Sequence, residues 1–359
     1  MLLTHTLFFL RGCARAPVPP CAESGSDGAS GAVRNLGKPV ALAKKYYDQG
    51  ADEITFLNIT GFRDFPLTDT PMLALIEEAS KEIFVPLTVG GGIRGFTDAN
   101  GVTSSALQVA DAYFRSGADK VSIGSDAVDV AKAYLQNKKK DGSTSIEQIS
   151  HVYGRQAVVV SIDPRRRWVA SKAAADGHAT VDHASYPDKG LRGPNGESIC
   201  WYECTVQGGR KGSGLDVVQL ATAVEALGCG ELLLNCIDND GQNDGYDLHL
   251  TRSVRRAVGI PVIASSGAGV PAHFAEVFDV CGVEAGLAAS ILHKDLVSVG
   301  EIKEHLASVA IDMRPEGMSA ATIARLAGKS GIGTSSKMLL GAMVALGVGV
   351  AVMSLAKRR

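Results

Sequence analysis

The sequence predicts an α/β fold, a (β/α)8 barrel of the TIM type, from three observations. Apolar segments of strand length alternate with amphipathic segments of helix length from residue 38 onward, which is the pattern of a parallel sheet. The segment Val158–Ile162 is rich in β-branched residues, as expected of a strand covered on both faces. Two parts of the chain are similar to each other, which is typical of a repeated half-barrel. We count seven strands, whereas a closed barrel of this kind needs eight.

Each element is assigned from its apolar pattern and from the residues that end it. The expected strands cover residues 53–59, 84–89, 119–123, 158–163, 231–237, 261–264 and 283–288. The expected helices cover residues 39–49, 70–81, 104–116, 127–135, 215–226, 248–258, 272–278 and 302–308. Gly50 stops the first helix, and most strands run into turns of small or acidic residues. A polar, glycine-rich excursion at residues 171–214 is expected to hold a hairpin at Trp201–Val206.

The segment Val158–Arg166 is the one around which the chain is organised. Its apolar run ends in Asp163, and Pro164 then stops the strand because proline cannot donate a ladder hydrogen bond. In a (β/α)8 barrel the catalytic groups lie at the carboxyl ends of the strands. Asp163 is therefore a candidate catalytic residue, and its alternative role is to cap the turn that follows.

Small residues occupy matching positions at the ends of two pairs of strands. Residues 85–92 and 121–125 form one pair, and residues 260–267 and 286–290 form the other. Small residues let backbone N–H groups approach an anion, and a helix N-terminus adds a favourable dipole. A tight turn also needs glycine, but the match between the two pairs favours phosphate binding. The sequence therefore predicts a substrate with a phosphate at each end.

The composition excludes several classes of protein. A chain of 359 residues with a formal charge of −2 has room for one large domain with extensions, or for two domains, and shows no basic surface for nucleic acid. Seven cysteines in such a chain do not make a disulfide framework, and Cys229, Cys236 and Cys281 lie in apolar runs typical of buried thiols. The sequence has no Cys-x-x-Cys and no His-Glu-x-x-His motif, so we expect no metal and no cofactor.

The barrel is expected at residues 34–312, between two segments of different composition. Residues 1–33 are expected to be a disordered leader and linker, typical of a transit-type leader, a weak signal peptide or a mispredicted first exon. Residues 313–336 are expected to be a linker, and residues 337–359 a hydrophobic tail. The apolar run at 338–356 is just long enough to span a bilayer, so a membrane-spanning helix and a buried tail are both open interpretations.

Six stretches carry a family resemblance: 51–60, 87–94, 117–126, 158–166, 231–247 and 261–269. Across residues 34–306 the chain resembles the cyclase subunit of imidazole glycerol phosphate synthase, the HisF-type barrel of histidine biosynthesis. The related HisA-type barrel, aminoimidazole ribotide isomerase, shares the half-barrel repeat, but Asp163–Arg166 and Asp240–Asp247 favour the cyclase. The excursion at 194–210 is similar to that of eukaryotic enzymes in which a glutaminase is fused in front of the cyclase.

The resemblance implies a lyase reaction in the cytoplasm or a plastid. Ammonia, supplied by a glutaminase domain or subunit, and a bis-phosphorylated ribulosyl intermediate give imidazole glycerol phosphate and an aminoimidazole carboxamide ribotide. Asp163 matches one of two general acid–base aspartates, Asp240 matches a supporting acid, and Asn235 matches a substrate contact. The phosphate sites match Gly92, Gly124 and Ser125 on one side, and Gly241, Gly267, Ala289 and Ser290 on the other. Glu53, Lys120 and Glu231 match a ring of charges that admits ammonia, and the alternative for these three is a solvated rim of ion pairs.

The resemblance stops at the first strand. In the family this strand ends in the other catalytic aspartate, within a run of the type Ala-Cys-Leu-Asp-Val-Arg, and this sequence has no such run. Thr4–Leu10 is the local segment apolar enough to take its place, and it brings no carboxylate. Unless this segment fills the gap, the barrel is expected to be incomplete at its N-terminus, with open strand edges and poor cyclase activity. The alternative function is a catalytically inactive, membrane-tethered barrel that binds phosphorylated ligands as a scaffold.

Overall fold

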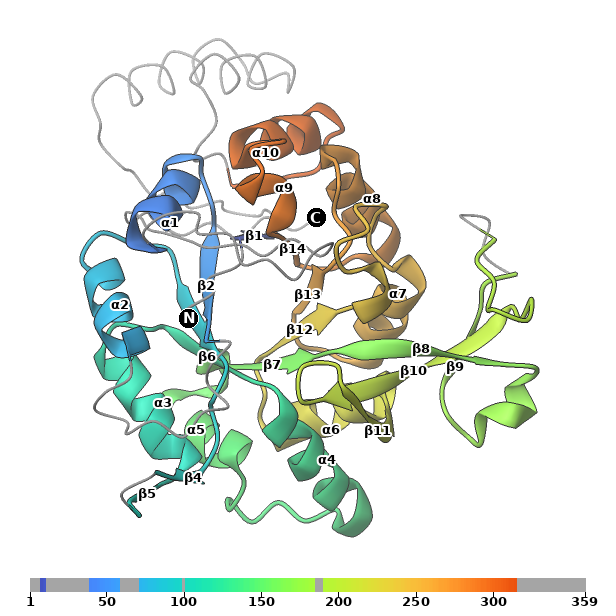
Figure 1. Ribbon diagram of the computed structural model, residues 1–359, viewed down its shortest axis with the longest axis horizontal. Helices are drawn as coiled ribbons and strands as arrows, with labels where there is room; N and C mark the ends of the chain where they lie inside the picture. Colours follow the sequence, from blue (N-terminus) through green and yellow to red (C-terminus); the bar gives the residue numbers. More distant parts are fainter. Residues whose placement is uncertain (1–6, 11–38, 59–70, 99–100, 185–189, 315–359) are drawn as a thin grey trace, which may run out of the picture.

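The computed structural model describes residues 7–10, 39–58, 71–98, 101–184 and 190–314, and a closed barrel of eight strands lies at their centre (Figure 1). Around the barrel the strands follow the order β1-β14-β13-β12-β7-β6-β3-β2. The parallel strands are β2 (Glu53–Leu57), β3 (Leu87–Gly90), β6 (Lys120–Ile123), β7 (Val158–Ile162), β12 (Glu231–Asn235), β13 (Val262–Ser265) and β14 (Ala285–Ala288). The predicted (β/α)8 class and its seven expected strands are thus confirmed, with shifted ends.

The eighth position is taken by β1 (Leu7–Leu10), which runs antiparallel to both of its neighbours. Leu7 pairs with Ala288 and Leu10 with Ala285 on β14, while on the other side Leu7 pairs with Ile54 on β2. The segment expected to substitute for the first strand therefore does so over four residues. Within the segment expected to be a leader and linker, residues 1–33, these four residues thus form a strand, because backbone pairing with two open edges satisfies groups that would otherwise lack partners.

Helices cover the outside of the barrel, as Figure 1 shows. They are α1 (Pro39–Asp48), α2 (Pro71–Ser80), α3 (Ala106–Arg115), α4 (Ser125–Asn137), α5 (Ser145–Tyr153), α6 (Val217–Leu227), α7 (Leu248–Ala257), α8 (Pro271–Cys281), the short α9 (Ser290–His293) and α10 (Val299–Ser308). The helix α5 was not expected. Its start nevertheless has a sequence signal, because Thr144 and Glu147 form a reciprocal capping box.

The alternation of side chains along each strand decides what faces the inside of the barrel. Val159, Leu233, Ile263, Ala285 and Leu287 form a separate buried cluster, distinct from the large core between strands and helices. On β7, Ser161 and Asp163 follow Val159 at two-residue intervals and therefore share its inward face. The same spacing places Glu231 and Asn235 on either side of Leu233, at opposite ends of β12.

A second sheet leaves the barrel directly after β7. Pro164 ends the pairing of β7 and begins β8 (Pro164–Val169), which pairs with β10 (Ile199–Val206). The strand β10 also pairs with β11 (Lys211–Asp216) and β9 (Thr180–Asp182), so the predicted hairpin is longer than expected. In Figure 1 this sheet extends away from the barrel on the right. The short elements of the described residues also include β4 (Phe96–Thr97), β5 (Thr103–Ser104) and the 3-10 turns η2 (Arg155–Ala157), η3 (Lys172–Ala175) and η4 (Ile237–Asn239).

Candidate functional site

Asp163 lies at the carboxyl end of β7, at the mouth of the barrel. Its Oδ1 accepts a hydrogen bond of 3.0 Å from the Asn235 side-chain amide, which also donates to Ser161 Oγ at 3.1 Å. Asn235 comes from the end of β12, the strand next to β7. The structure thus brings together the predicted catalytic residue and one predicted substrate-binding residue.

The surroundings of Asp163 favour its protonated form. Burial raises the pKa of this carboxyl above its ordinary value, and the negative charge of Asp240 raises it further, whereas the hydrogen bond from Asn235 lowers it only in part. Asp240 itself is exposed, directly after the turn η4, and acts on Asp163 through its charge. A carboxyl whose pKa is shifted toward neutrality can both give and take a proton.

Thr205 on β10 fixes the backbone at Asp163, and the sequence did not single it out. The backbone N–H of Thr205 donates to the Asp163 carbonyl at 3.0 Å, and its hydroxyl donates to the same oxygen at 2.7 Å. Two residues further, the N–H of Gln207 donates to Ser125 Oγ at 3.1 Å, and Arg165 donates to the Gly209 carbonyl at 3.0 Å. The β10–β11 hairpin therefore reaches from the acid on β7 to the start of α4.

The first predicted phosphate turn lies at the ends of β3 and β6. Gly91 and Gly92 have φ angles of +89° and +78°, and a Cβ on Gly91 would lie 2.3 Å from the carbonyl oxygen of Asn58. Gly124 precedes α4 without a side-chain cap, and a Cβ there would meet nothing within 4 Å. An uncapped helix start with open space at the residue before it suits an anion. Ser125 opens α4 and presents its hydroxyl at the same end.

The second predicted phosphate turn joins three strand ends. Gly241 has a φ of +73° with open space at its Cα, and Gly267 has a φ of +101° and accepts a hydrogen bond of 2.8 Å from Gly245 N–H. Ala289 precedes α9 without a side-chain cap. Ser290 donates to the Asn243 side chain at 3.3 Å, which brings its turn to the loop of Gly241. The predicted residues of this turn are therefore gathered at the mouth.

At the opposite end of the barrel, three predicted residues form one ion cluster. Lys120 Nζ lies 2.7 Å from Glu53 Oε2 and 2.6 Å from Glu231 Oε2, and Thr88 donates to Glu53 Oε1 at 2.5 Å. Only 1% of the Glu53 side chain and 8% of the Glu231 side chain are exposed, so the alternative of a solvated rim of ion pairs is wrong. Burial and the charge of Glu53 raise the pKa of Glu231 to about 7, although Lys120 acts in the other direction.

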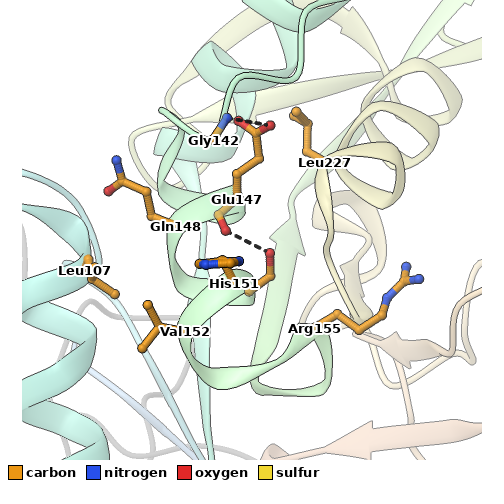
Figure 2. A pocket seen from close by; sticks show the side chains of 9 residues that line it. Leu107, Gly142, Glu147, Gln148, His151, Val152, Arg155 and Leu227 are labelled. Carbon is orange, nitrogen blue, oxygen red and sulfur yellow. Dashed lines mark hydrogen bonds between the residues drawn. The ribbon is translucent and has the colours of Figure 1, made fainter.

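A hollow of about 580 Å³ lies elsewhere, in the helical layer (Figure 2). Its walls come from α3, α5 and the end of α6, and include Leu107, His151, Arg155 and Leu227. Figure 2 shows Glu147 turned back onto the backbone of Gly142 at its upper edge. None of the candidate residues at the mouth lines this hollow, so it lies apart from the acid and the two phosphate turns.

The described part of the chain also bears on metal sites, free thiols and membrane-spanning helices. There, no group of three or more His, Cys, Asp or Glu side chains is arranged to hold a metal ion. Cys229, Cys236 and Cys281 are free and buried, as predicted. Within the same residues no helix is long and apolar enough to cross a bilayer. The tail at 337–359 and most of the linker at 313–336 lie outside the described residues.

A family model and several known proteins match this chain over most of its length. A family model described as "Histidine biosynthesis protein" matches residues 26–298. The chain is 57% identical over 282 residues to imidazole glycerol phosphate synthase hisHF, chloroplastic, of Arabidopsis thaliana, a match over 79% of this chain and 46% of that protein. It is 55% identical over 286 residues to hisHF of Schizosaccharomyces pombe, covering 79% of this chain and 51% of that protein.

A shorter relative is matched over most of its length. The chain is 42% identical over 278 residues to imidazole glycerol phosphate synthase subunit HisF of Haloarcula marismortui, covering 77% of this chain and 87% of that protein. The chain thus spans about half the length of the two hisHF relatives. The extent of the family match and these identities show that the chain belongs to the histidine biosynthesis protein family, as a HisA/HisF-type barrel similar to the imidazole glycerol phosphate synthases.

Proposed function

We propose that this barrel carries out the cyclase step of imidazole glycerol phosphate synthesis. In this reaction ammonia and a bis-phosphorylated ribulosyl intermediate give imidazole glycerol phosphate and an aminoimidazole carboxamide ribotide. The observation that carries the proposal is the position of Asp163, at the same barrel end as two glycine-rich turns suited to phosphate. The names of the HisF and hisHF relatives support the same reaction. None of the comparisons supports the alternative of a membrane-tethered scaffold.

Asp163 serves as the general acid–base group in this proposal. Its raised pKa brings the carboxyl closer to neutral pH, where a group that both takes and gives protons is most effective. Asn235 holds one carboxyl oxygen, which leaves the other oxygen for the substrate. Thr205 holds the backbone carbonyl of the same residue, so the side chain projects from a fixed point.

The two turns bind the two phosphates. Gly92, Gly124 and Ser125 take one phosphate, and Gly241, Gly267, Ala289 and Ser290 take the other. Backbone N–H groups and uncapped helix starts recognise an anion without a large side chain. With both ends of the substrate held, its reacting centre lies across the mouth and next to Asp163. Holding the substrate in this orientation raises the reaction rate, because the substrate's rotational freedom is already lost on binding.

Ammonia enters from the opposite end of the barrel. Lys120, Glu53 and Glu231 lie at the amino ends of their strands, on the face that points into the barrel. In the proposal this buried cluster is the gate, and a glutaminase domain or subunit supplies ammonia there. Breaking a buried ion pair is costly, so the cluster holds the entrance closed until a partner or a substrate shifts it.

The first strand limits the rate in this proposal. The β1 segment Leu7–Leu10 contains no ionisable side chain, so it gives the mouth no second acid–base carboxylate. We therefore expect this chain to form product more slowly than a barrel with an aspartate at that strand end. One positioned acid–base group typically contributes about 10²–10⁴-fold to a rate, which sets the scale of the deficit.

The test is a comparison of Asp163→Asn with the unchanged 359-residue chain, with ammonium salt as the nitrogen source. We expect formation of imidazole glycerol phosphate to fall by about 10²–10⁴-fold in the variant. The matched control is Asp48→Asn on the surface of α1, which should leave turnover unchanged. Equal turnover of Asp163→Asn and the unchanged chain would refute the role of Asp163. An unchanged chain that forms no product at all would refute the proposed activity.

A further inference from the structure

The loop that carries Gly241 is strongly acidic. Asp238, Asp240, Asp244 and Asp247 all lie within ten residues of one another, around the turn proposed to bind the second phosphate. A phosphate that approached such a loop would be repelled by carboxylates unless their charge were offset. A cation that pairs with part of this loop, without occupying the phosphate position, would reduce that repulsion.

Arg166, on β8, is such a cation and approaches the loop from the side of the second sheet. Its backbone N–H donates to Asp238 Oδ2 at 2.8 Å, and its Nε donates to Asp247 Oδ2 at 3.0 Å. The guanidinium also donates to Asn239 Oδ1, so one planar group holds two side chains of the loop. Only 11% of the Arg166 side chain is exposed, which reduces the screening of its charge by water.

Asn239 links Arg166 to the second phosphate turn. Its side-chain amide donates to the Gly245 carbonyl at 2.8 Å, and Gly245 N–H donates to the Gly267 carbonyl at 2.8 Å. A Cβ on Gly267 would lie 2.2 Å from the Gly245 carbonyl oxygen, so the two backbones are in direct contact. A displacement of Asn239 is therefore transmitted to the turn at Gly267.

Tyr202, on β10, is a second side chain that holds Asp247. Its hydroxyl lies 2.9 Å and 2.8 Å from the two oxygens of Asp247, to which it donates. Asp247 in turn accepts a hydrogen bond of 2.9 Å from Leu250 N–H at the start of α7. Burial alone would raise the pKa of Asp247, but Arg166, the Leu250 N–H and Tyr202 together lower it, so the carboxylate stays charged and paired.

We propose that Arg166 is a positioning residue that fixes the loop at 238–247 and offsets the charge of Asp247, and that it thereby sets the affinity of the second phosphate turn. Asn239 transmits its effect and Tyr202 supports it. Arg166 also follows Asp163 by three residues, so the acid–base strand and the second phosphate turn are held by one continuous segment. The inference rests on the proposed function, because it assumes that the turn binds phosphate.

The experiment is a titration of the full-length chain with inorganic phosphate, followed by the backbone amide signals of Gly124, Ser125, Gly241 and Gly267 in NMR spectra. The main variant is Arg166→Lys, which keeps the charge but cannot hold Asp247 and Asn239 together. We expect the dissociation constant reported by Gly241 and Gly267 to rise about tenfold, which corresponds to about 1.4 kcal/mol. The dissociation constant reported by Gly124 and Ser125 should stay within about twofold, because no contact of Arg166 reaches that turn.

A second variant guards against misfolding. Tyr202→Phe removes only a hydroxyl and should also weaken phosphate binding at Gly241 and Gly267 selectively, by a smaller factor than Arg166→Lys. Its matched control is Tyr153→Phe, which removes a hydroxyl that donates to Asp111 between α5 and α3 and should change neither turn. The kinetic constants give an independent readout. If Arg166 positions the phosphate turn, its substitution raises KM for the bis-phosphorylated substrate by a larger factor than it lowers kcat.

The possible outcomes separate this inference from the proposed function. If neither turn of the unchanged chain responds to phosphate, the proposed function fails and the inference falls with it. If both turns respond in the unchanged chain but Arg166→Lys and Tyr202→Phe alter neither, only the positioning role is wrong. An equal loss at both turns would also overturn it, because that result indicates a general disturbance of the barrel.

Discussion

Replacing Glu231 by glutamine should remove the loss of folding stability that this side chain causes as the pH rises through about 7. Glu231 shares Lys120 with Glu53 in a buried cluster of two carboxylates and one ammonium group. The cluster carries an excess negative charge when both acids are ionised. Burial and the charge of Glu53 therefore raise the pKa of Glu231 from 4.5 to about 7, against the opposing effect of Lys120.

The sign and size of the effect follow from linkage. An acid with a raised pKa in the folded state holds its proton more tightly when folded, so its contribution to stability is complete below pH 4.5 and is lost as the pH rises through about 7. One unit of pKa corresponds to about 1.4 kcal/mol, so the shift that this environment causes is worth about 3 kcal/mol above neutral pH. The neutral side chain of Glu231→Gln cannot titrate and lacks this loss.

The assay is urea unfolding of the unchanged chain and of Glu231→Gln at a series of pH values from about 4 to 8, which brackets both the ordinary and the raised pKa. The free energy of unfolding of the variant, relative to the unchanged chain, should rise by about 3 kcal/mol over this interval. Glu77→Gln on α2, where the acid is exposed, serves as the control and should show no such trend. Parallel pH curves for the unchanged chain and Glu231→Gln would refute the assignment of a raised pKa to Glu231.

Two further substitutions test other buried features. Lys303 Nζ lies 2.7 Å from Asp52 Oδ2, with both side chains fully buried, and Arg314 Nε lies 2.9 Å from Asp52 Oδ1. Lys303→Met should lower the free energy of unfolding, measured by heat or urea, by about 3 kcal/mol, because it leaves a buried charge with one partner fewer. A loss below about 1 kcal/mol would show that Arg314 compensates. Gly91→Ala would force a Cβ to within 2.3 Å of the Asn58 carbonyl oxygen at a φ of +89°. We expect the free energy of unfolding to fall by at least about 1–3 kcal/mol, and phosphate binding at Gly124 to weaken. A variant as stable as the unchanged chain would show that the turn can relax.

The parts of the fold that repeat were predictable from the sequence. Strands β7 and β12 are mostly apolar, and each has a polar residue at its carboxyl end, Asp163 directly after β7 and Asn235 as the last residue of β12. The run and this polar residue together fix both the strand and the inward direction of Asp163 and Asn235. The same alternation places Glu231 at the other end of the barrel. Continuous apolar runs are sufficient to locate these strands because each strand is covered on both faces. The alternation of side chains along a strand then assigns each residue to the inside or the outside of the barrel.

The parts that depend on contacts between distant residues were not predictable in the same way. Thr205 lies far beyond Asp163 in the sequence, and only the pairing of β8 with β10 brings its two donors to the Asp163 carbonyl. Arg166 was visible as part of a motif, but its contact with Asn239 requires the loop after β12 to fold over β8. A hydrogen bond across such a separation leaves no periodic trace in a single sequence.

The direction of β1 determines which end of the barrel its last residue reaches. Leu7 pairs with Ala288 at the carboxyl end of β14, and Leu10 pairs with Ala285 at its amino end. A chain that runs this way leaves the strand at the end of the barrel where Glu53 lies, as the pairing of Phe8 with Glu53 shows. Backbone pairing closes the sheet in either direction, whereas a strand brings its last residue to the mouth only when it is parallel to its neighbours. Among the described strands, the acid–base chemistry proposed for this mouth therefore depends on β7.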